Sequence, residues 1–247
     1  MKLKSFSTRA PNKFSKEKTK IKTDVLKPQI DVLQNLMYAE GKHSLLIILQ
    51  GMDASGKDGV IKNVFSIVNP QGCSVVSFKK PTETEMKHDF LWRIHSQVPE
   101  KGMIGIFNRS HYEDVLIQRV HKWVDDDIIK QRFININNFE KLLKENDTVV
   151  LKFFLYVSRE EQLQRLNERM KDETKMWKYN KEDLNERKYW NQYMSAYEDA
   201  INNCNEIPWH IIPADQNWYK EYLISDIVVK EMNKLKMKYP GIKKSEE

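Results

Sequence analysis

The sequence has very little cysteine and no long apolar run. Only Cys73 and Cys204 occur in 247 residues, far apart and without metal-ligand neighbours or a paired spacing. This usage suits a reducing compartment and excludes a disulfide framework, so we expect two free thiols. The roughly 20 consecutive apolar residues of a membrane span are absent, and no apolar signal-peptide segment follows the basic N-terminus. The sequence therefore predicts a cytoplasmic protein with no membrane partner.

Signatures of several hydrolase classes are missing as well. His88, His95 and His111 do not form the helix-spaced pair with a supporting acid that binds zinc in metal hydrolases. The sequence also contains no nucleophile elbow, no paired-cysteine motif and no internal repeat. Hydrolytic chemistry of these kinds is therefore a poor fit.

Positive charge is concentrated at the N-terminal end of the chain. Residues 1–27 contain nine Lys or Arg and two Asp or Glu, a net charge of +7, so the remaining 220 residues carry −1 of the total of +6. This polar, lysine-rich composition predicts a basic flexible arm over residues 1–27 and a single domain over residues 28–247. Because the body is nearly neutral, we expect no nucleic-acid partner, and any polyanion site must be a local cluster.

The apolar residues form an alternating pattern of strands and helices. A helix is predicted from Pro28 to near Gly41. Continuous apolar runs, typical of strands buried on both faces of a parallel sheet, follow at residues 45–49, 74–78, 103–107, 148–157 and 209–212. Helical stretches lie between them at residues 60–68, 88–97 and 128–143. The pattern predicts an α/β fold with three α/β/α layers and a parallel central sheet.

The motif with the clearest chemistry is GMDASGKD at residues 51–58. Gly51, Gly56 and Lys57 have the spacing of a phosphate-binding loop, and the motif lies between a predicted strand and a predicted helix. Such a loop can turn its N–H groups toward a phosphate, and the lysine reaches the terminal phosphate oxygens. Asp58 replaces the usual Ser or Thr after the lysine, and Asp53 lies within the loop. Acids in these positions are best explained beside a bound cation.

A second polar cluster follows the third predicted strand, in GMIGIFNRSHYED at residues 102–114. Ligands of open α/β sheets bind at the carboxyl ends of the strands. Arg109 can there form two parallel hydrogen bonds to phosphate oxygens, while Glu113 or Asp114 can complete a magnesium shell with Asp53. By itself, a polar stretch after a strand is equally well an ordinary loop.

The segment from about residue 158 to residue 203 is helical in composition and rich in charges of both signs. A solvated helix face is the plain interpretation, and the nearby phosphate loop favours a mobile lid bearing arginines over about residues 159–190. Trp177, Trp190 and Tyr193 either stack on a base or, more commonly for aromatic residues at helical spacing, pack in the core.

Several of these motifs together resemble the polyphosphate kinase type 2 family. The resemblance is carried by GMDASGKDG at 51–59, KPTETEMKHDFLWRIHSQVP at 80–99 and IFNRSHYEDVLIQRV at 106–120. It continues through REEQLQRLNERMKDETKMWKYNKEDL at 159–184 and IPWHIIPADQNW at 207–218. It extends over about residues 28–232 and implies a thymidylate-kinase-like P-loop kinase fold with a helical lid.

The resemblance also implies an activity and a set of site residues. The activity is reversible, Mg²⁺-dependent phosphoryl transfer between inorganic polyphosphate and purine nucleoside diphosphates, with monophosphates as further acceptors, by a homo-oligomer. Catalytic roles fall to Asp53, Lys57, Arg109, Asp114 and Arg169, and metal binding to Asp53, Glu113 and Asp114. Nucleotide or polyphosphate binding is predicted for Gly51, Ala54, Ser55, Gly56, Asp58, Lys80, Arg93, Arg119, Arg165 and Lys178.

Two alternatives remain open from the sequence. An ATP-dependent nucleoside monophosphate kinase shares the phosphate loop, the sheet and an arginine-bearing lid. A regulatory or nucleic-acid-binding P-loop protein could instead use the basic arm at residues 1–27 to contact phosphates without catalysis.

Overall fold

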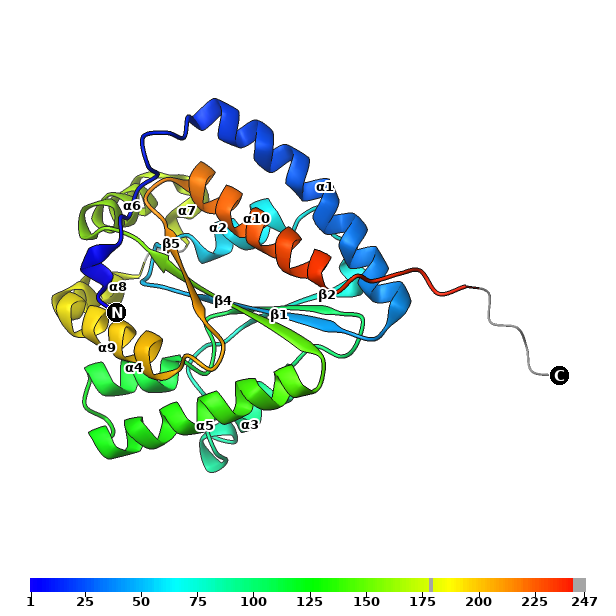
Figure 1. Cartoon of the computed structure of the whole chain (residues 1–247). Coiled ribbons are helices and arrows are strands. Elements are labelled where there is room, and N and C mark those ends of the chain that lie inside the picture. The colour runs from blue at the N-terminus through cyan, green and yellow to red at the C-terminus, as the bar shows by residue number, and fades with distance from the viewer. Residues whose placement is uncertain (178–179, 242–247) are drawn as a thin grey trace.

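A five-stranded parallel sheet forms the centre of the protein, as seen in a computed structural model that describes residues 1–177 and 180–241 (Figure 1). The strand order is β2-β3-β1-β4-β5. The strands are β1 (Ser44–Gln50), β2 (Cys73–Ser77), β3 (Ile104–Asn108), β4 (Thr148–Tyr156) and β5 (Trp209–Pro213). All five predicted strands are confirmed, because each apolar run supplies side chains for both covered faces of the sheet.

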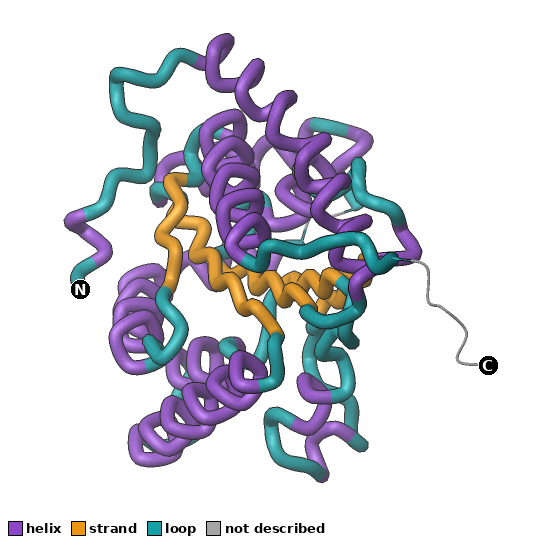
Figure 2. Tube along the Cα trace, turned by 45° about the vertical axis from the view of Figure 1, so that its right-hand side comes forward, coloured by secondary structure: helices purple, strands orange, loops and turns teal. Residues whose placement is uncertain are grey.

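Helices cover both faces of this sheet, so the predicted three layers are confirmed (Figures 1 and 2). Helices α1, α2 and α10 lie on one face, and α4, α5 and α9 lie on the other. Helices α6, α7 and α8 lie beyond the carboxyl ends of the strands. The helix bounds are α1 Lys16–Glu40, α2 Lys57–Val64, α3 Trp92–His95, α4 Glu113–Val120, α5 Asp126–Glu145, α6 Arg159–Lys171, α7 Glu173–Met176, α8 Lys181–Glu186, α9 Trp190–Asn203 and α10 Asn217–Lys234; short 3₁₀ helices occupy Leu3–Ser5, Pro70–Gly72, Glu85–Lys87 and Arg187–Tyr189.

The central strand β1 directs the chain to both sides of the sheet. All seven of its residues are buried, and it pairs with β3 on one side and with β4 on the other. The chain leaves β1 toward β2 and β3, and then crosses to β4 and β5. The carboxyl ends of β1 and β3 therefore border the crevice at which an open α/β sheet binds its ligands.

Helix α1 begins twelve residues before the predicted start at Pro28. Ser15 caps its first turn by accepting a hydrogen bond from the Lys18 N–H, and Pro28 lies inside the helix. The helix thus crosses the predicted boundary between residues 27 and 28. The early turns bury Thr19 and Thr23, and the Thr23 hydroxyl donates to the Thr19 carbonyl at 3.0 Å. Because the buried side of these turns is made of threonines, apolar periodicity could not reveal them.

The first fourteen residues lie against the body, where the sequence predicts a flexible arm. Leu3 is buried, and its N–H donates to the Glu198 carboxylate at 2.8 Å. The Thr8 hydroxyl donates to Asp215 at 2.8 Å, and the rings of Phe14 and Tyr219 lie 4.9 Å apart. A few apolar and neutral polar side chains dock this segment, while its lysines remain on the surface.

An ion pair is buried in the core between β4 and α5. The Lys152 ammonium donates to Glu140 at 2.6 Å, to the Tyr112 hydroxyl at 2.9 Å and to the Cys204 carbonyl at 2.9 Å. The Tyr112 hydroxyl donates to the second Glu140 oxygen at 2.7 Å. The side chains of Lys152 and Glu140 are fully buried, so each charge depends on the other for its compensation.

One further sequence prediction about a helix needs adjustment. The predicted helix at residues 88–97 is reduced to the single turn of α3, because the preceding residues form turns and a 3₁₀ turn.

In the described part of the chain, no helix combines the length and the apolar character needed to cross a membrane.

Candidate functional site

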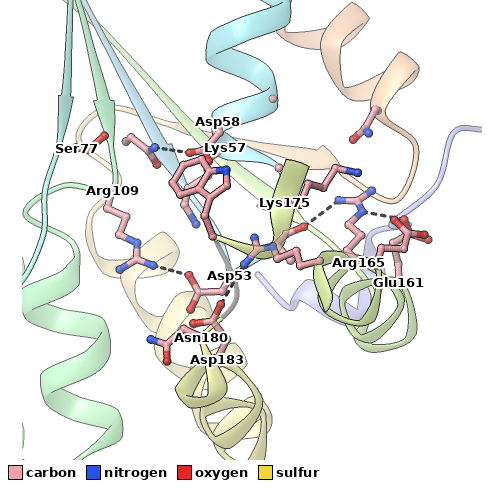
Figure 3. A pocket seen from close by; sticks show the side chains of 18 of the residues that line it. Asp53, Lys57, Asp58, Ser77, Arg109, Glu161, Arg165, Lys175, Asn180 and Asp183 are labelled. Carbon is pink, nitrogen blue, oxygen red and sulfur yellow. Dashed lines mark hydrogen bonds and ion pairs between the residues drawn. The ribbon is translucent and has the colours of Figure 1, made fainter. Parts of the chain in front are cut away.

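A cavity of about 810 Å³ opens at the carboxyl edge of the sheet (Figure 3). Four parts of the chain form its walls: the loop between β1 and α2 with the start of α2, the ends of β2 and β3, helices α6 to α8 with the residues between them, and the start of α10. The predicted site residues that line it are Asp53, Ala54, Gly56, Lys57, Asp58, Arg109, Arg165 and Arg169. The structure thus brings together residues that lie more than 100 positions apart in the sequence.

The loop between β1 and α2 has a backbone that requires glycine at two positions. Gly51 has φ +150°, and a Cβ there would lie 2.8 Å from the Leu155 carbonyl oxygen of the neighbouring strand. Gly56 has φ +94°, and a Cβ there would lie 2.2 Å from the Lys220 Nζ. The two glycines therefore allow the loop to lie close to β4 on one side and to α10 on the other.

Lys57 begins helix α2 and is held inside the loop. Its ammonium donates to the Gly51 carbonyl at 2.7 Å and to the Met52 carbonyl at 3.3 Å. Burial and the neighbouring Arg109 guanidinium lower the pKa of Lys57 to about 8, although Asp53 opposes this shift. An anionic phosphate would favour the charged form of Lys57 as Asp53 does, so this ammonium is placed to bind a phosphate.

Arg109 and Asp53 form an ion pair across the cavity floor (Figure 3). Arg109 directly follows β3 with φ +64°, and its N–H donates to the Leu49 carbonyl of β1 at 3.1 Å. Burial alone would raise the pKa of Asp53, but Arg109 and Lys57 lower it overall. Asp53 therefore stays ionised and neutralises part of the positive charge until a substrate anion arrives.

Arg169 makes a second ion pair within the cavity, donating to Asp183 at 3.0 Å. This pair joins α6 to α8, the two helices of the predicted lid. Burial raises the pKa of Asp183, and the nearby negative charge of Asp53 adds to this shift. Two arginines that face the cavity thus have carboxylate partners that a phosphate can replace.

Arg165 lies in the cavity wall, but its guanidinium supports the loop. Its Nε donates to Glu161 at 2.8 Å, and its two terminal nitrogens donate to the carbonyls of residues 54, 55, 214 and 215 at 2.8 to 3.2 Å. These five contacts use all five N–H donors of an arginine. The structure therefore gives Arg165 a supporting position in place of the predicted direct contact with substrate.

Lys220 supports the same loop from α10. This side chain is buried, and its ammonium donates to the Ser55 carbonyl at 3.2 Å, to the Gly56 carbonyl at 3.5 Å and to the Asn217 side chain at 2.9 Å. Burial and the nearby Arg165 lower the pKa of Lys220 to about 7. A buried lysine beside two other cations is costly, which indicates that the position serves a purpose.

The three carboxylates predicted to bind metal do not converge. Glu113 lies near Arg109 and Lys57, and burial raises its pKa. Asp114 instead accepts a hydrogen bond from Gln118 at 2.5 Å, and burial raises its pKa to about 6. Within residues 1–177 and 180–241, no group of three or more His, Cys, Asp or Glu side chains is arranged to hold a metal ion. Asp53 alone of the predicted three lines the cavity.

Several predicted binding residues lie outside the cavity lining. Arg93 donates to the Lys79 carbonyl at 2.8 Å, and Arg119 pairs with Asp199 at 2.5 Å and with Asp126 at 3.6 Å. Both arginines therefore brace neighbouring loops and helices. Gly51, Ser55 and Lys80 are also absent from the lining, and Lys178 lies outside the described residues.

Other lining residues were not predicted. Asn108 ends β3 and donates to Asp58 at 2.8 Å, and its place at a strand end was a usable signal. Asn217 and Asp183 lie in helical segments where nothing in the local sequence marks them. Among the aromatic residues, Trp177 lines the cavity and is 77% exposed, whereas Trp190 and Tyr193 are buried and pack in the core.

Comparison with known proteins gives consistent matches over nearly the whole chain. Residues 13–240 match the family described as Polyphosphate kinase 2 (PPK2). A Meiothermus ruber protein named AMP/ADP-polyphosphate phosphotransferase is 49% identical over 218 residues, which cover 87% of this chain and 82% of that protein. The ADP-polyphosphate phosphotransferase of Rhodopseudomonas palustris is 42% identical, with coverage of 88% and 81%. The crystal structure of Polyphosphate Kinase 2 from Arthrobacter aurescens TC1 superposes with a TM-score of 0.95 at 38% identity, covering 99% of this chain and 89% of that one.

Proposed function

The chain belongs to the polyphosphate kinase 2 family, and we propose that it transfers phosphoryl groups reversibly between inorganic polyphosphate and a purine nucleoside diphosphate. The relatives named above are polyphosphate phosphotransferases that act on ADP or on AMP and ADP. Nucleoside monophosphates are accordingly proposed as further acceptors. The ATP-dependent nucleoside monophosphate kinase considered from the sequence is not favoured by these relatives.

The observation that carries the proposal is the set of cationic side chains around one cavity. Lys57, Arg109 and Arg169 come from three different elements and line the same space. Phosphoryl transfer needs reactants held in line and positive charge around the oxygens of the transferring group. The cavity supplies this charge, and its arginines have carboxylate partners that phosphate oxygens can displace.

In the proposed reaction, Lys57 and the loop N–H groups hold the terminal phosphate of the polymer. A terminal oxygen of the nucleoside diphosphate attacks the phosphorus of this terminal phosphate in line. The bond between that phosphorus and the bridging oxygen of the polymer breaks, and the polymer leaves one phosphate shorter. Arg109 and Arg169 stabilise the negative charge on the transferring group. The attacking phosphate oxygen is already anionic, so no strong general base is needed.

Magnesium is proposed as the cofactor because the donor set is composed of oxygen. The Asp53 and Asp58 carboxylates both line the cavity, and Mg²⁺ binds through one or two carboxylates together with substrate phosphates and water. When bound, the ion would neutralise phosphate charge during transfer. Asp53 is the better-placed ligand because it stays ionised and lies next to the side chains proposed to hold the phosphates, whose oxygens would share the ion.

The activity is tested by incubating the purified protein with ADP, Mg²⁺ and long-chain polyphosphate and measuring ATP by luminescence. We expect ATP to form only when polyphosphate is present. Consumption of ATP with a nucleoside monophosphate, and no ATP from ADP or AMP with polyphosphate, would instead support an ordinary nucleotide kinase.

Replacement of Asp53 is expected to weaken the use of magnesium. In Asp53→Asn the half-saturating Mg²⁺ concentration should rise roughly tenfold or more, because a neutral amide is a poorer ligand than a carboxylate. Asp114→Asn is the matched comparison, since Asp114 contacts Gln118 outside the cavity lining, and its shift should be smaller. Identical magnesium titration curves for wild type and Asp53→Asn would remove Asp53 as a ligand.

A homo-oligomeric assembly and a cytoplasmic location complete the proposal. The first comes from the family resemblance and the second from the low cysteine content. Size-exclusion chromatography with light scattering measures the assembly directly.

A further inference from the structure

The carbonyl side of the phosphate loop faces two cations, the buried Lys220 and the partly buried Arg165. Arg165 donates to the carbonyls of Ala54 and Ser55, and Lys220 donates to those of Ser55 and Gly56. In a trans peptide the C=O and the next N–H point in opposite directions. Fixing the carbonyls of residues 55 and 56 on this side therefore turns the N–H groups of residues 56 and 57 the other way. Residues 56 and 57 line the cavity.

We propose that Lys220 is a positioning residue, which holds the phosphate loop in its binding conformation by anchoring the Ser55 and Gly56 carbonyls. Phosphate binding by the loop rests on the proposed function above. The anchoring itself depends on the burial of Lys220 and on its contacts with Ser55, Gly56 and Asn217, and Lys220 itself does not line the cavity. Lys220 acts through the loop backbone.

The Lys220 ammonium has as many N–H donors as this position has acceptors, and it fits the space available there. Its three N–H donors meet three acceptors, namely the carbonyls of residues 55 and 56 and the Asn217 side chain. The absent side chain of Gly56 leaves the space that the ammonium occupies, because a Cβ would approach Nζ to 2.2 Å. Gly56 and Lys220 thus fit each other, because a side chain at position 56 would displace the ammonium from its acceptors.

The electrostatic surroundings of Lys220 make its charge state dependent on pH near neutrality. Arg165 and Lys57 disfavour the ammonium, whereas Glu161 and Glu221 favour it, and burial lowers the pKa to about 7. Above pH 7 the neutral amine keeps two N–H donors for three acceptors. We therefore expect kcat/KM for polyphosphate to fall as pH rises through about 7.

The test compares Lys220→Met and Lys220→Arg with a matched control, Lys230→Met. Lys230 lies on the same helix and is exposed, with an ion pair to Asp226. Lys220→Met should lower kcat/KM for polyphosphate roughly tenfold or more, because the Ser55 carbonyl then keeps only Arg165 and the Gly56 carbonyl only the Val60 N–H as donor, and neither bond is made from α10. Its thermal unfolding midpoint should stay within a few degrees of wild type, because an apolar side chain replaces a buried charge. Lys230→Met should leave both quantities unchanged.

Lys220→Arg supplies the readout that a purely structural lysine would not give. Arginine stays charged at all relevant pH values, so it should recover most of kcat/KM and remove the fall near pH 7. Wild-type kcat/KM in Lys220→Met would overturn the proposal. So would a loss of activity that accompanies a lowered unfolding midpoint and is not recovered by Lys220→Arg.

Calorimetric titration with tripolyphosphate separates this inference from the proposed function. Wild type should bind tripolyphosphate, and Lys220→Met should bind it several-fold more weakly. If the wild-type protein makes no ATP from polyphosphate, the proposed function is wrong. The role of Lys220 is then decided by comparing the tripolyphosphate affinities of wild type and Lys220→Met. Equal affinity of both proteins for tripolyphosphate counts against Lys220 as a positioning residue.

Discussion

Lys57→Ala should reduce polyphosphate-dependent ATP formation by a factor on the order of hundreds or more. The Lys57 ammonium occupies the centre of the loop between two backbone carbonyls, and it is the cation through which the loop reaches terminal phosphates. One preorganised charge of this kind stabilises the transition state by several kcal/mol. The measurement is the initial rate of luminescence at saturating ADP and polyphosphate.

The fold should survive Lys57→Ala, because burial disfavours the charged form of Lys57 and its removal takes no favourable buried charge from the folded protein. Lys62→Ala provides the matched control, since Lys62 lies on the same helix with an exposed side chain and outside the cavity lining. We expect wild-type turnover in Lys62→Ala. Substantial turnover by a folded Lys57→Ala protein would exclude the role given to Lys57.

Lys152→Met should destabilise the protein by about 3–5 kcal/mol, the typical effect of leaving a buried charge without its partner. Glu140 is fully buried, and Lys152 and His111 together keep its pKa low against the opposing effect of burial. Without the ammonium the Glu140 pKa rises, so the carboxylate must take up a proton or remain unpaired. Urea unfolding at pH 5 and pH 8 measures the loss in the free energy of unfolding. The loss should be larger at pH 8, because Glu140 is then ionised in the unfolded chain and must bind a proton or stay unpaired on folding.

The double variant Lys152→Met with Glu140→Leu is the control for this second prediction. Removing both charges leaves an apolar interior, so the double variant should recover much of the lost stability. Equal unfolding free energies of wild type and Lys152→Met would show that the pair contributes nothing to the fold.

The sheet and the floor of the cavity were predictable from the sequence, whereas the supports of the cavity were not. The five apolar runs identify the strands because both faces of a parallel sheet are covered. Arg109 follows such a run directly, and Lys57 follows another across the short phosphate loop, so both had to lie at the carboxyl edge. Lys220 stands alone in a helix and has no motif around it, and its contacts with residues 55 and 56 arise only from the packing of α10.

The early start of α1 and the role of Arg165 escaped prediction for different physical reasons. The first turns of α1 bury threonines, which produce no apolar stripe. Arg165 is assigned to substrate by its motif, but the structure engages all five of its donors within the protein. A motif identifies the residue and leaves open whether its charge faces the ligand or the loop that holds it.

The Asp215 carboxylate joins the N-terminal segment to helix α6. One of its oxygens accepts from the Thr8 hydroxyl, and the other accepts from the Ser158 N–H at the start of α6. With Arg165 bound to the loop, both the root and the middle of α6 are fastened to the body. The start of α6 is therefore joined to the N-terminal segment and its middle to the phosphate loop, so the docked N-terminus and one wall of the cavity share a single hydrogen-bonded support.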